Sequence, residues 1–296
     1  MSLLDNFIKH KFLDSWVNLK SNVTNYFWAR KFKGEERIIV PPSEYRAVFE
    51  DDFKQPLNTE KWRYAMPWGD FHGGYLHQYY DTDGTLSYVS SEGLILELRR
   101  IPKTWKKSDL PEWRQTSGIP DVLTIPVGVG FVSTKQYWRY GWFEASIKLP
   151  KGQSYWNAFW MSGEYTWPPE IDIFEAYSHE GPEYQSNKFK HRRIKPNLHY
   201  RLVKNNSQRM YGSFNNTVAE ATKRFVQYVC HWEENFIKIY YDGKLVLQCT
   251  DPKILDWFNK PNSHHFLILN HGLHADHPEI PDESAMIVRN VKIYQK

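Results

Sequence analysis

Short runs in which every second residue is apolar dominate the chain from Tyr45 onward. A period of two sends alternate side chains to opposite faces of a β-strand, so these runs predict half-buried strands. Gly, Pro, Asn and Asp separate the runs, as expected for turns. The predicted strands cover residues 46–49, 86–89, 94–99, 127–133, 141–149, 158–161, 170–176, 198–202, 225–232, 236–241, 244–248, 266–270 and 287–294.

Turns, and not helices, join these strands. Asp242-Gly243 lies between two apolar runs and is the strongest hairpin signal, because both residues tolerate the positive φ of a tight turn. The chain shows no strand–helix alternation and no internal repeat, which argues against a parallel α/β fold. We therefore predict an all-β fold, an antiparallel β-sandwich or jelly roll.

The first 40 residues follow a different period. Apolar residues recur there every three to four positions, which indicates one or two short amphipathic helices. We interpret residues 1–40 as a helical appendage that packs on the main domain or mediates association with a partner. Membrane-surface binding is a weaker alternative, because seven Lys and Arg against four Asp and Glu give only a small basic excess. Pro41-Pro42-Ser43 marks the boundary with the main domain, residues 45–296.

Three carboxylates fall within six residues of one predicted strand. Glu170 and Asp172 share a face of this strand, whereas strict alternation would direct Glu175 into the core. One extra residue near Ile173 and Phe174, a β-bulge, returns Glu175 to the side of the other two carboxylates. Bulges are frequent beside active sites because they re-aim a side chain.

This acidic stretch has two interpretations. An alternation of acidic and apolar residues is also typical of a half-exposed strand that has no chemical role. However, three close like charges repel one another, and a merely solvated strand would intersperse Lys or Thr. Close carboxylates with shifted pKa values are typical of acid/base sites.

The amino-acid composition favours some classes of function over others. The chain has 13 Trp, 19 Tyr and 17 Phe, more rings than a core needs, which suggests that some rings line a sugar-binding surface. A β-rich core that favours aromatic residues is the alternative. The net charge is only +4, far from the clustering of many Lys and Arg residues that is typical of a nucleic-acid-binding protein.

The two cysteines are predicted to lie too far apart for a disulfide bond. Cys230 and Cys249 lie on strands that flank residues 236–241, so about 10 Å separates them, beyond the ~7 Å that a disulfide spans. We predict free thiols.

The sequence contains no run of about 18 apolar residues, so no transmembrane segment is predicted. Charged residues interrupt any signal-peptide core near the N-terminus, so we expect no secretory signal there and leave the localisation open.

The acidic strand and its flanks resemble glycoside hydrolase family 16. The segment EIDIFE at 170–175 is similar to the ExDxxE signature of the bulge-carrying branch of this family. YGWFEASIKLPKG at 140–152 and WNAFWM at 156–161 resemble the strands that lead to the family's groove. Further similarities, over roughly residues 45–296, are Trp68-Gly69, Gln78-Tyr79-Tyr80, Asp242-Gly243 and the last strand at 288–295.

The resemblance implies a bent β-jelly roll whose concave face forms an open cleft for a polysaccharide. It also implies endo-hydrolysis of β-glycosidic bonds with retention of configuration. By position, Glu170 would be the nucleophile and Glu175 the general acid/base, with Asp172 between them. Retention requires two carboxyl groups about 5–5.5 Å apart, which one face of a bulged strand can supply without a cofactor.

Candidate substrate-binding residues follow from alternation and from the resemblance. Trp156 and Trp160 share one face of their strand, and the resemblance places both in the cleft, flanking the cleaved bond. His199 stands where the family often has a cleft-facing His, although a satisfied histidine on a sandwich strand is the alternative. Weaker candidates are Trp68, Tyr79, Tyr155 and Asn270.

Departures from the family pattern bear on the substrate. Residues 74–76 and 270–274 differ from the segments of members that cut β-1,3-glucan. A β-1,3- or mixed β-1,3/1,4-glucan is still slightly favoured. The alternative is a galactan, sulfated or not, such as agar, porphyran or carrageenan, because the basic run at 188–195 contains Arg, which pairs bidentately with sulfate. A solvated charged loop is the simpler explanation of that run.

We expect neither a cofactor nor a metal. Structural calcium occurs in many relatives, but Arg289 replaces the usual Asp ligand of the last strand and Asp52 replaces a longer Glu near the start. Calcium requires oxygen ligands and is repelled by Arg. Two rival functions are a non-catalytic carbohydrate-binding jelly roll, which has no use for the acidic cluster, and a transglycosylase, which shares the covalent intermediate.

Overall fold

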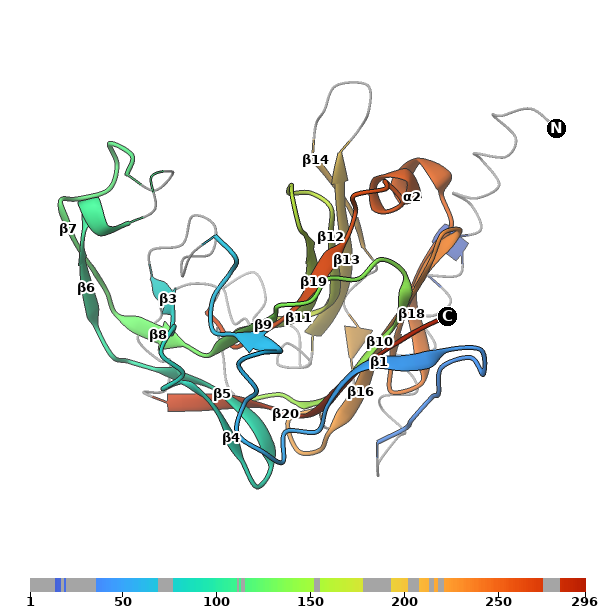
Figure 1. Ribbon diagram of the computed structural model, residues 1–296, viewed down its shortest axis with the longest axis horizontal. Coiled ribbons are helices and arrows are strands. Elements are labelled where there is room, and N and C mark those ends of the chain that lie inside the picture. Colours follow the sequence, from blue (N-terminus) through green and yellow to red (C-terminus); the bar gives the residue numbers. More distant parts are fainter. Residues whose placement is uncertain are drawn as a thin grey trace.

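Two large β-sheets form the molecule (Figure 1). The computed structural model describes residues 14–16, 19, 36–68, 77–110, 112, 115–151, 155–177, 193–201, 208–212, 216–217, 221–273 and 283–296. Between the two sheets lies one large hydrophobic core, to which both sheets contribute side chains. The predicted all-β sandwich is therefore confirmed.

The larger sheet has ten strands. In spatial order its main path is β18 (Lys244–Cys249), β17 (Phe236–Tyr241), β16 (Val226–Glu233), β10 (Gly141–Lys148), β20 (Glu283–Gln295), β5 (Gly93–Arg99), β8 (Val127–Val129) and β3 (Gln78–Tyr80). Two further strands, β1 (Arg46–Asp51) and β4 (Ser87–Ser90), pair with β20 and β5. Among the described strands, only β3 and β8 pair in parallel.

The second sheet carries the acidic stretch. Its order is β14 (Gln208–Gly212), β13 (Arg193–Arg201), β12 (Glu170–Tyr177), β11 (Trp156–Gly163), β19 (His265–Asn270), β9 (Phe131–Thr134) and β2 (Trp62–Arg63), with β15 (Asn216–Thr217) beside β13. Strand β12 lies near the middle of the sheet, so it has a neighbouring strand on each side. A separate two-stranded sheet joins β6 (Lys103–Lys106) to β7 (Val122–Ile125).

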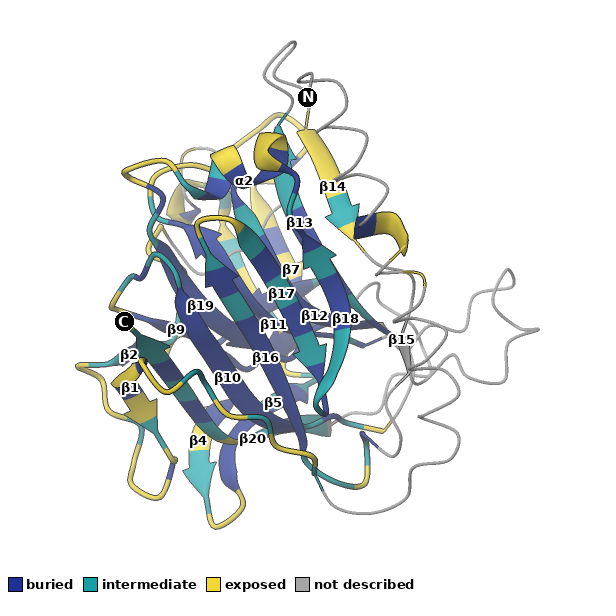
Figure 2. Ribbon diagram, turned by 90° about the vertical axis from the view of Figure 1, so that its right-hand side faces the viewer, coloured by how far each residue is buried: buried dark blue, intermediate teal, exposed yellow. Residues whose placement is uncertain are grey.

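Alternation along the strands decides which side chains enter the core. On β11, Phe159 and Met161 are fully buried in the core, whereas Trp156, Ala158 and Trp160 lie on the opposite face. Figure 2 shows how continuously the central strands are buried. The expected hairpin is also present, since Asp242 and Gly243 both have positive φ between β17 and β18.

Some elements differ from the prediction. The run 127–133 forms two strands in different sheets, β8 and β9, on either side of Gly130, where the backbone passes so close to Leu86 and Glu97 that a Cβ would overlap them. Helix α2 (Pro252–Phe258) was not predicted, although Asp251 followed by Pro252 is a typical helix start in a sequence. In the structure the Asp251 side chain caps the helix by accepting a hydrogen bond from Lys253 N at 2.9 Å. Strands β2, β3, β6, β7, β14 and β15 were also not predicted.

Most of the N-terminal segment lies outside the described residues. The part that is described packs on the larger sheet and its hairpin. Arg37 N donates to Asp242 Oδ1 at 2.7 Å, and Ile39 exchanges two hydrogen bonds with the Gln227 side chain at 2.8 and 3.0 Å. Asp14, at a helical position, accepts from Thr250 N at 2.7 Å. The division into residues 1–40 and 45–296 stays a prediction.

Both cysteines are buried free thiols. Cys230 lies on β16 and Cys249 on β18, with β17 between them. The prediction of unpaired thiols is confirmed. Among the described residues, no helix is both long and apolar enough to cross a membrane.

Candidate active site

Strand β12 contains the bulge that its sequence requires. Two consecutive residues of β11 lie opposite Phe174 and Asp172, which leaves Ile173 without an opposite residue. The pairing with β13 shifts at the same place, between Asp172 and Glu175. As a result Glu170, Asp172 and Glu175 all line one hollow on the face of the sheet that points away from the core.

Strand β13 supplies polar groups to this acidic row. His199 is in register with Glu170, Asn197 with Asp172 and Lys195 with Glu175. Residues two apart on a strand share a face, so the three side chains face the carboxylates as a second row. The acidic cluster therefore lies beside hydrogen-bond donors and one positive charge.

Glu175 is held from both sides. Trp156 Nε1, from β11, donates to Glu175 Oε1 at 2.9 Å, and Asn197 Nδ2, from β13, donates to Glu175 Oε2. On β14 the residue opposite Asn197 is Gly212, where a Cβ would overlap the Asn197 amide oxygen. The carboxyl group of Glu175 is thus fixed in orientation by donors on two strands.

Glu170 and Asp172 share one imidazole. His199 Nε2 lies 3.4 Å from Glu170 Oε1 and 3.2 Å from Asp172 Oδ2. The other oxygen of Glu170, Oε2, accepts a hydrogen bond of 2.8 Å from Trp167 Nε1. Each of the two glutamates therefore receives an indole N–H, from opposite ends of the acidic row.

Burial and like charge shift the acidity of the row. Burial, followed by the Asp172 carboxylate, raises the pKa of Glu170 well above its ordinary value, whereas His199 and the Trp167 N–H act in the opposite direction. Burial and the Glu175 carboxylate likewise raise the pKa of Asp172 well above its ordinary value. Protonation of Glu170 and of Asp172 therefore persists to higher pH than in isolated carboxylic acids, and because their charges interact the two groups titrate together.

The structure brings four of the seven predicted substrate-binding residues to this site. Trp156, Trp160 and Asn270 line the hollow, and His199 contacts its carboxylates. Asn270 contacts both tryptophan residues: its Oδ1 accepts from the ring nitrogen of Trp160, Nε1, at 2.8 Å, and its Nδ2 donates to the backbone carbonyl of Trp156 at 3.4 Å.

The structure places two of the predicted residues away from the hollow. Tyr79 does not line the hollow, because alternation on β3 turns its neighbours Gln78 and Tyr80 toward the hollow and Tyr79 against Trp105. Tyr155 is fully buried beside His271, with ring centroids 4.9 Å apart, so it cannot reach a sugar.

Trp68 lies apart from the carboxylates but on the same face of the sheet. It is 44% exposed, and its ring packs edge-on against Phe266 at 5.8 Å. Phe266 is four residues from Asn270 on β19, and therefore on the cleft side. Trp68 stays a candidate for a more distant sugar contact. Residues 74–76 and most of the basic run 188–195 lie outside the described residues.

Sequence reasoning missed several residues of the site. Gln78, Tyr80 and Ala158 line the hollow, and Asn197 and Trp167 donate to the two glutamates. Asn197 precedes His199 by two residues, so alternation alone would have placed both on one face. No comparable signal points to Trp167, because its place depends on the course of a loop.

The acidic row is not assigned a metal. Glu170, Asp172 and His199 each offer a ligand atom within 4.8 Å of the others. However, Trp167 and Asn197 direct N–H groups at carboxylate oxygens of the row, and a cation bound there would face these positive hydrogens.

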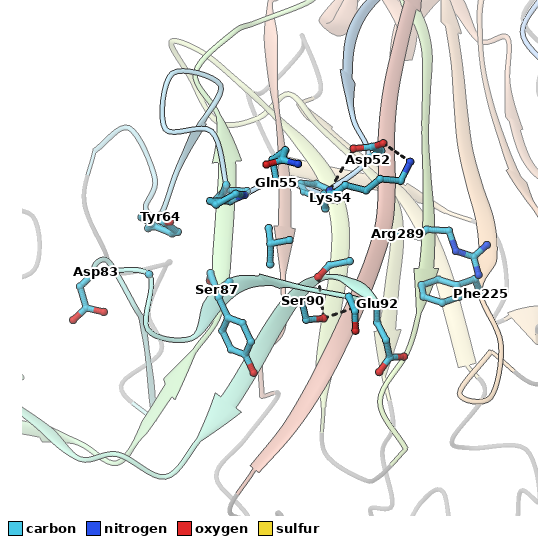
Figure 3. A pocket seen from close by; sticks show the side chains of 18 residues that line it. Asp52, Lys54, Gln55, Tyr64, Asp83, Ser87, Ser90, Glu92, Phe225 and Arg289 are labelled. Atoms are coloured by element: carbon cyan, nitrogen blue, oxygen red, sulfur yellow. Dashed lines mark hydrogen bonds and ion pairs between the residues drawn. The ribbon is translucent and has the colours of Figure 1, made fainter.

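The two positions to which the family resemblance assigns structural calcium do not suit a cation in this chain. Asp52 and Arg289 both line one hollow, distant in sequence from the acidic strand (Figure 3). Asp52 is paired with Lys54 at 2.8 Å, and Arg289 Nη1 lies 3.0 Å from Glu36 Oε2. Lys54 and Arg289 therefore place positive charge at both positions, which disfavours a calcium ion there.

A β-sandwich with an open hollow, lined by indole rings and clustered carboxylates, defines a class of proteins that act on sugar polymers. Within that class, residues 78–273 match the model of glycosyl hydrolases family 16, and the chain belongs to this family. It is a glycoside hydrolase of an endo-acting, retaining family.

Two curated relatives match part of the chain. An endo-1,3-1,4-beta-glycanase of Rhizobium meliloti is 29% identical over 118 residues, which are 38% of this chain and 22% of the relative. A glucan endo-1,3-beta-glucosidase of Cryptopygus antarcticus is 29% identical over 133 residues, 43% of this chain and 44% of the relative. The matched segments therefore span less than half of either relative.

Solved structures share the fold. LamAcat of Zobellia galactanivorans has a TM-score of 0.66 at 21% identity, over 84% of this chain and 97% of that one. The laminarinase catalytic domain of Thermotoga petrophila has a TM-score of 0.64 at 21% identity, over 87% and 99%. A structure reported with endo-acting O-glycanases of the human gut microbiota has a TM-score of 0.68 at 21% identity, over 88% and 93%. The sandwich is thus shared by proteins with different substrates.

Proposed function

We propose that this chain hydrolyses a β-1,3- or mixed β-1,3/1,4-glucan, with Glu170 as nucleophile and Glu175 as general acid/base. The observation that carries the proposal is the bulged strand β12, which puts both glutamates and Asp172 on one face of the cleft. The name of the Cryptopygus relative supports a β-1,3-glucan as the substrate, and the 1,3-1,4-β linkage in the name of the Rhizobium relative supports a mixed linkage.

The first step forms a glycosyl-enzyme. Glu170 attacks the anomeric carbon while Glu175 transfers its proton to the leaving glycosidic oxygen, so the bond to the leaving sugar breaks as the ester bond to Glu170 forms. Trp156 and Asn197 orient Glu175 for this transfer. Ala158, opposite Glu175 on β11, is too small to obstruct the leaving sugar.

The second step resolves the intermediate with water. Glu175, now a carboxylate, takes a proton from water as the oxygen attacks the anomeric carbon, and Glu170 leaves with its bonding electron pair. Two inversions at one carbon give net retention. Asp172 lies between the two glutamates and shares His199 with Glu170, so it influences the charge of the whole row through both stages.

The roles can be separated by azide rescue. Glu170→Ala should lose hydrolysis and, with azide and a substrate that has an activated aryl leaving group, form the α-glycosyl azide, because azide enters the face that the nucleophile vacated. Glu175→Ala should form the β-glycosyl azide, because the covalent intermediate still forms. Interchanged products would exchange the two roles, and near-wild-type hydrolysis by Glu170→Gln would end the proposal.

The substrate is tested with laminarin, lichenan, agarose, porphyran and carrageenans, by measuring reducing ends and product lengths. Short oligosaccharides from laminarin or lichenan would support the glucan. If the folded chain binds one of these polysaccharides but releases no reducing ends from any of them, the result favours a non-catalytic carbohydrate-binding protein. Products longer than the starting oligosaccharide would indicate transglycosylation.

A galactan, sulfated or neutral, is the second candidate. Lys195 is in register with Glu175, on the side of the general acid/base where the leaving part of the polymer would lie. A positive charge at that position favours an anionic sugar there. This alternative would be established if the wild type cleaves porphyran or carrageenan but no glucan, and if Lys195→Ala loses that cleavage.

A further inference from the structure

The loop between β11 and β12 places an indole beside Glu170. Trp167 Nε1 lies 2.8 Å from Glu170 Oε2 and donates a hydrogen bond to it. Trp167 is 43% exposed, so one part of its ring system is open to solvent while the N–H points at the carboxylate. Only two residues lie between them in sequence, and thus the loop must fold back to bring them together.

Hydrogen bonds at both ends hold this loop. Gly163 N donates to Pro169 O at 3.0 Å, which closes the loop where it leaves β11 and enters β12. From β13, Arg201 Nη2 donates to Trp167 O at 3.2 Å. Pro168 and Pro169, directly after the indole, are buried. The indole is therefore fixed relative to the strand that carries the nucleophile.

The ring system also contacts the imidazole of the site. Trp167 and His199 lie with ring centroids 5.9 Å apart and a tilt of 39°. His199 Nε2 lies 3.4 Å from Glu170 Oε1, the oxygen that Trp167 does not contact. The carboxylate is thus contacted at one oxygen by the indole and at the other by the imidazole, and the two rings support each other.

We propose that Trp167 is a positioning residue that keeps Glu170 ionised and oriented for attack on the anomeric carbon. The proposal rests on Glu170 acting as the nucleophile. A hydrogen bond from a neutral N–H favours the carboxylate over the carboxylic acid, since only the carboxylate accepts it with full charge. The same bond fixes the rotation of the carboxylate.

The other groups around Glu170 make this contribution necessary. Asp172 and Glu175, on the same strand, oppose its ionisation, and burial opposes it as well. On β13, His199 favours ionisation when it is protonated, and Arg201 lies at the carbonyl of Trp167. On β11 the residue opposite Glu170 is Ser162, which carries no charge. The indole N–H of Trp167 does not titrate, so Trp167 donates its hydrogen bond to Glu170 at every pH, whereas His199 favours ionisation of Glu170 only when His199 is protonated.

The first measurement needs no substrate. Carbon-13 NMR of glutamate carboxyl carbons, with the Glu170 signal assigned by its loss in Glu170→Gln, gives the titration midpoint of Glu170. In Trp167→Phe, which keeps an aromatic ring and lacks the N–H, the midpoint should rise by about one pH unit, about a tenfold change in the proton dissociation constant. An isosteric 3-benzothienylalanine at position 167, which replaces the N–H by sulfur, should give the same rise, and it serves if the Phe variant folds poorly.

Kinetics on the polysaccharide that the wild type cleaves give the second measurement. Because Glu170 must be ionised to attack, the acidic limb of the kcat/KM profile should move to higher pH by the same amount in Trp167→Phe. Tyr165→Phe, on the same loop and 71% exposed, is the matched control and should shift neither quantity.

An unchanged Glu170 midpoint in both Trp167 variants, or an equal shift in Tyr165→Phe, would overturn the inference. This result is distinct from failure of the proposed function. If Glu170→Gln is inactive and the midpoint does not move, only the role of Trp167 is wrong. If Glu170→Gln retains activity, Glu170 is not the nucleophile, and Trp167 loses its proposed role with it, whatever the NMR midpoint.

Discussion

Trp156 donates its indole N–H to Oε1 of Glu175 across the pair of strands β11 and β12, at 2.9 Å. The donor comes from a residue that the family resemblance had already placed in the cleft, so one side chain both lines the hollow and orients the proposed acid/base. Asn197 donates to the second oxygen of the same carboxyl group. This double restraint is the basis of the first prediction.

We expect Trp156→Phe to lower kcat on a polysaccharide by about 10- to 100-fold, since a hydrogen bond to a charged group contributes about 1.5–3 kcal/mol. The loss should be much smaller on an aryl β-glycoside with a good leaving group, because such a substrate needs little proton transfer to the leaving oxygen. The ratio of the two kcat values is the measurement. Equal losses on both substrates would assign Trp156 to binding or stability and not to acid/base orientation.

We expect Glu170→Gln to stabilise the folded protein at neutral pH. Burial raises the pKa of Glu170 in the folded state, so ionised Glu170 destabilises the fold at pH values above that raised pKa, and the destabilisation disappears as the pH falls toward the unfolded value. Gln is neutral throughout. A gain of about 1 kcal/mol, or about 2–4 °C in Tm, should therefore appear at pH 7 and shrink near pH 4.

Thermal unfolding at the two pH values measures this gain. Glu60→Gln, which removes an exposed carboxylate far from the site in sequence, is the control and should leave Tm unchanged at both. A Glu170→Gln protein that is less stable than the wild type at pH 7 would show that the hydrogen bonds to Glu170 outweigh the cost of its burial.

The acidic strand could be predicted from sequence because it follows a local rule. The bulge at Ile173 was deducible, since three carboxylates and the apolar residues between them satisfy both faces of one strand only with an extra residue. The face shared by Trp156 and Trp160 followed from the same period of two. These features depend on neighbours within a few positions of the chain.

Features that depend on distant segments could not be predicted in this way. Tyr79 was placed in the cleft, but a short strand of three residues gives alternation too little length to choose between Tyr79 and its neighbours. Trp167 reaches Glu170 through the course of a loop, which leaves no periodic signal in the sequence. Alternation could have placed Asn197 on the face of His199, but its contact with Glu175 depends on the register between two strands. The donors of the site were for this reason harder to find than its acids.

The two thiols should be inert in the folded protein. Cys230 and Cys249 are fully buried, and burial raises the pKa of both, so the reactive thiolate is scarce at neutral pH. A thiol reagent such as dithionitrobenzoate should label neither under native conditions and both in denaturant. Rapid labelling of the native protein would contradict their burial between the sheets.

Calcium should neither stabilise this protein nor be needed for its activity. Arg289 stands where the family resemblance implies an acidic ligand; it is paired with Glu36 at 3.0 Å and lies 3.8 Å from the Phe225 ring centroid (Figure 3). Adding calcium or a chelator should therefore leave Tm unchanged, whereas Arg289→Ala should lower the free energy of unfolding by about 1 kcal/mol, the upper range for a half-exposed ion pair. A double-mutant cycle with Glu36→Gln separates the pair from the ring contact, because only the pair contributes a coupling energy. A Tm that rises with calcium in the wild type would show that a cation binds in spite of Arg289 and Lys54.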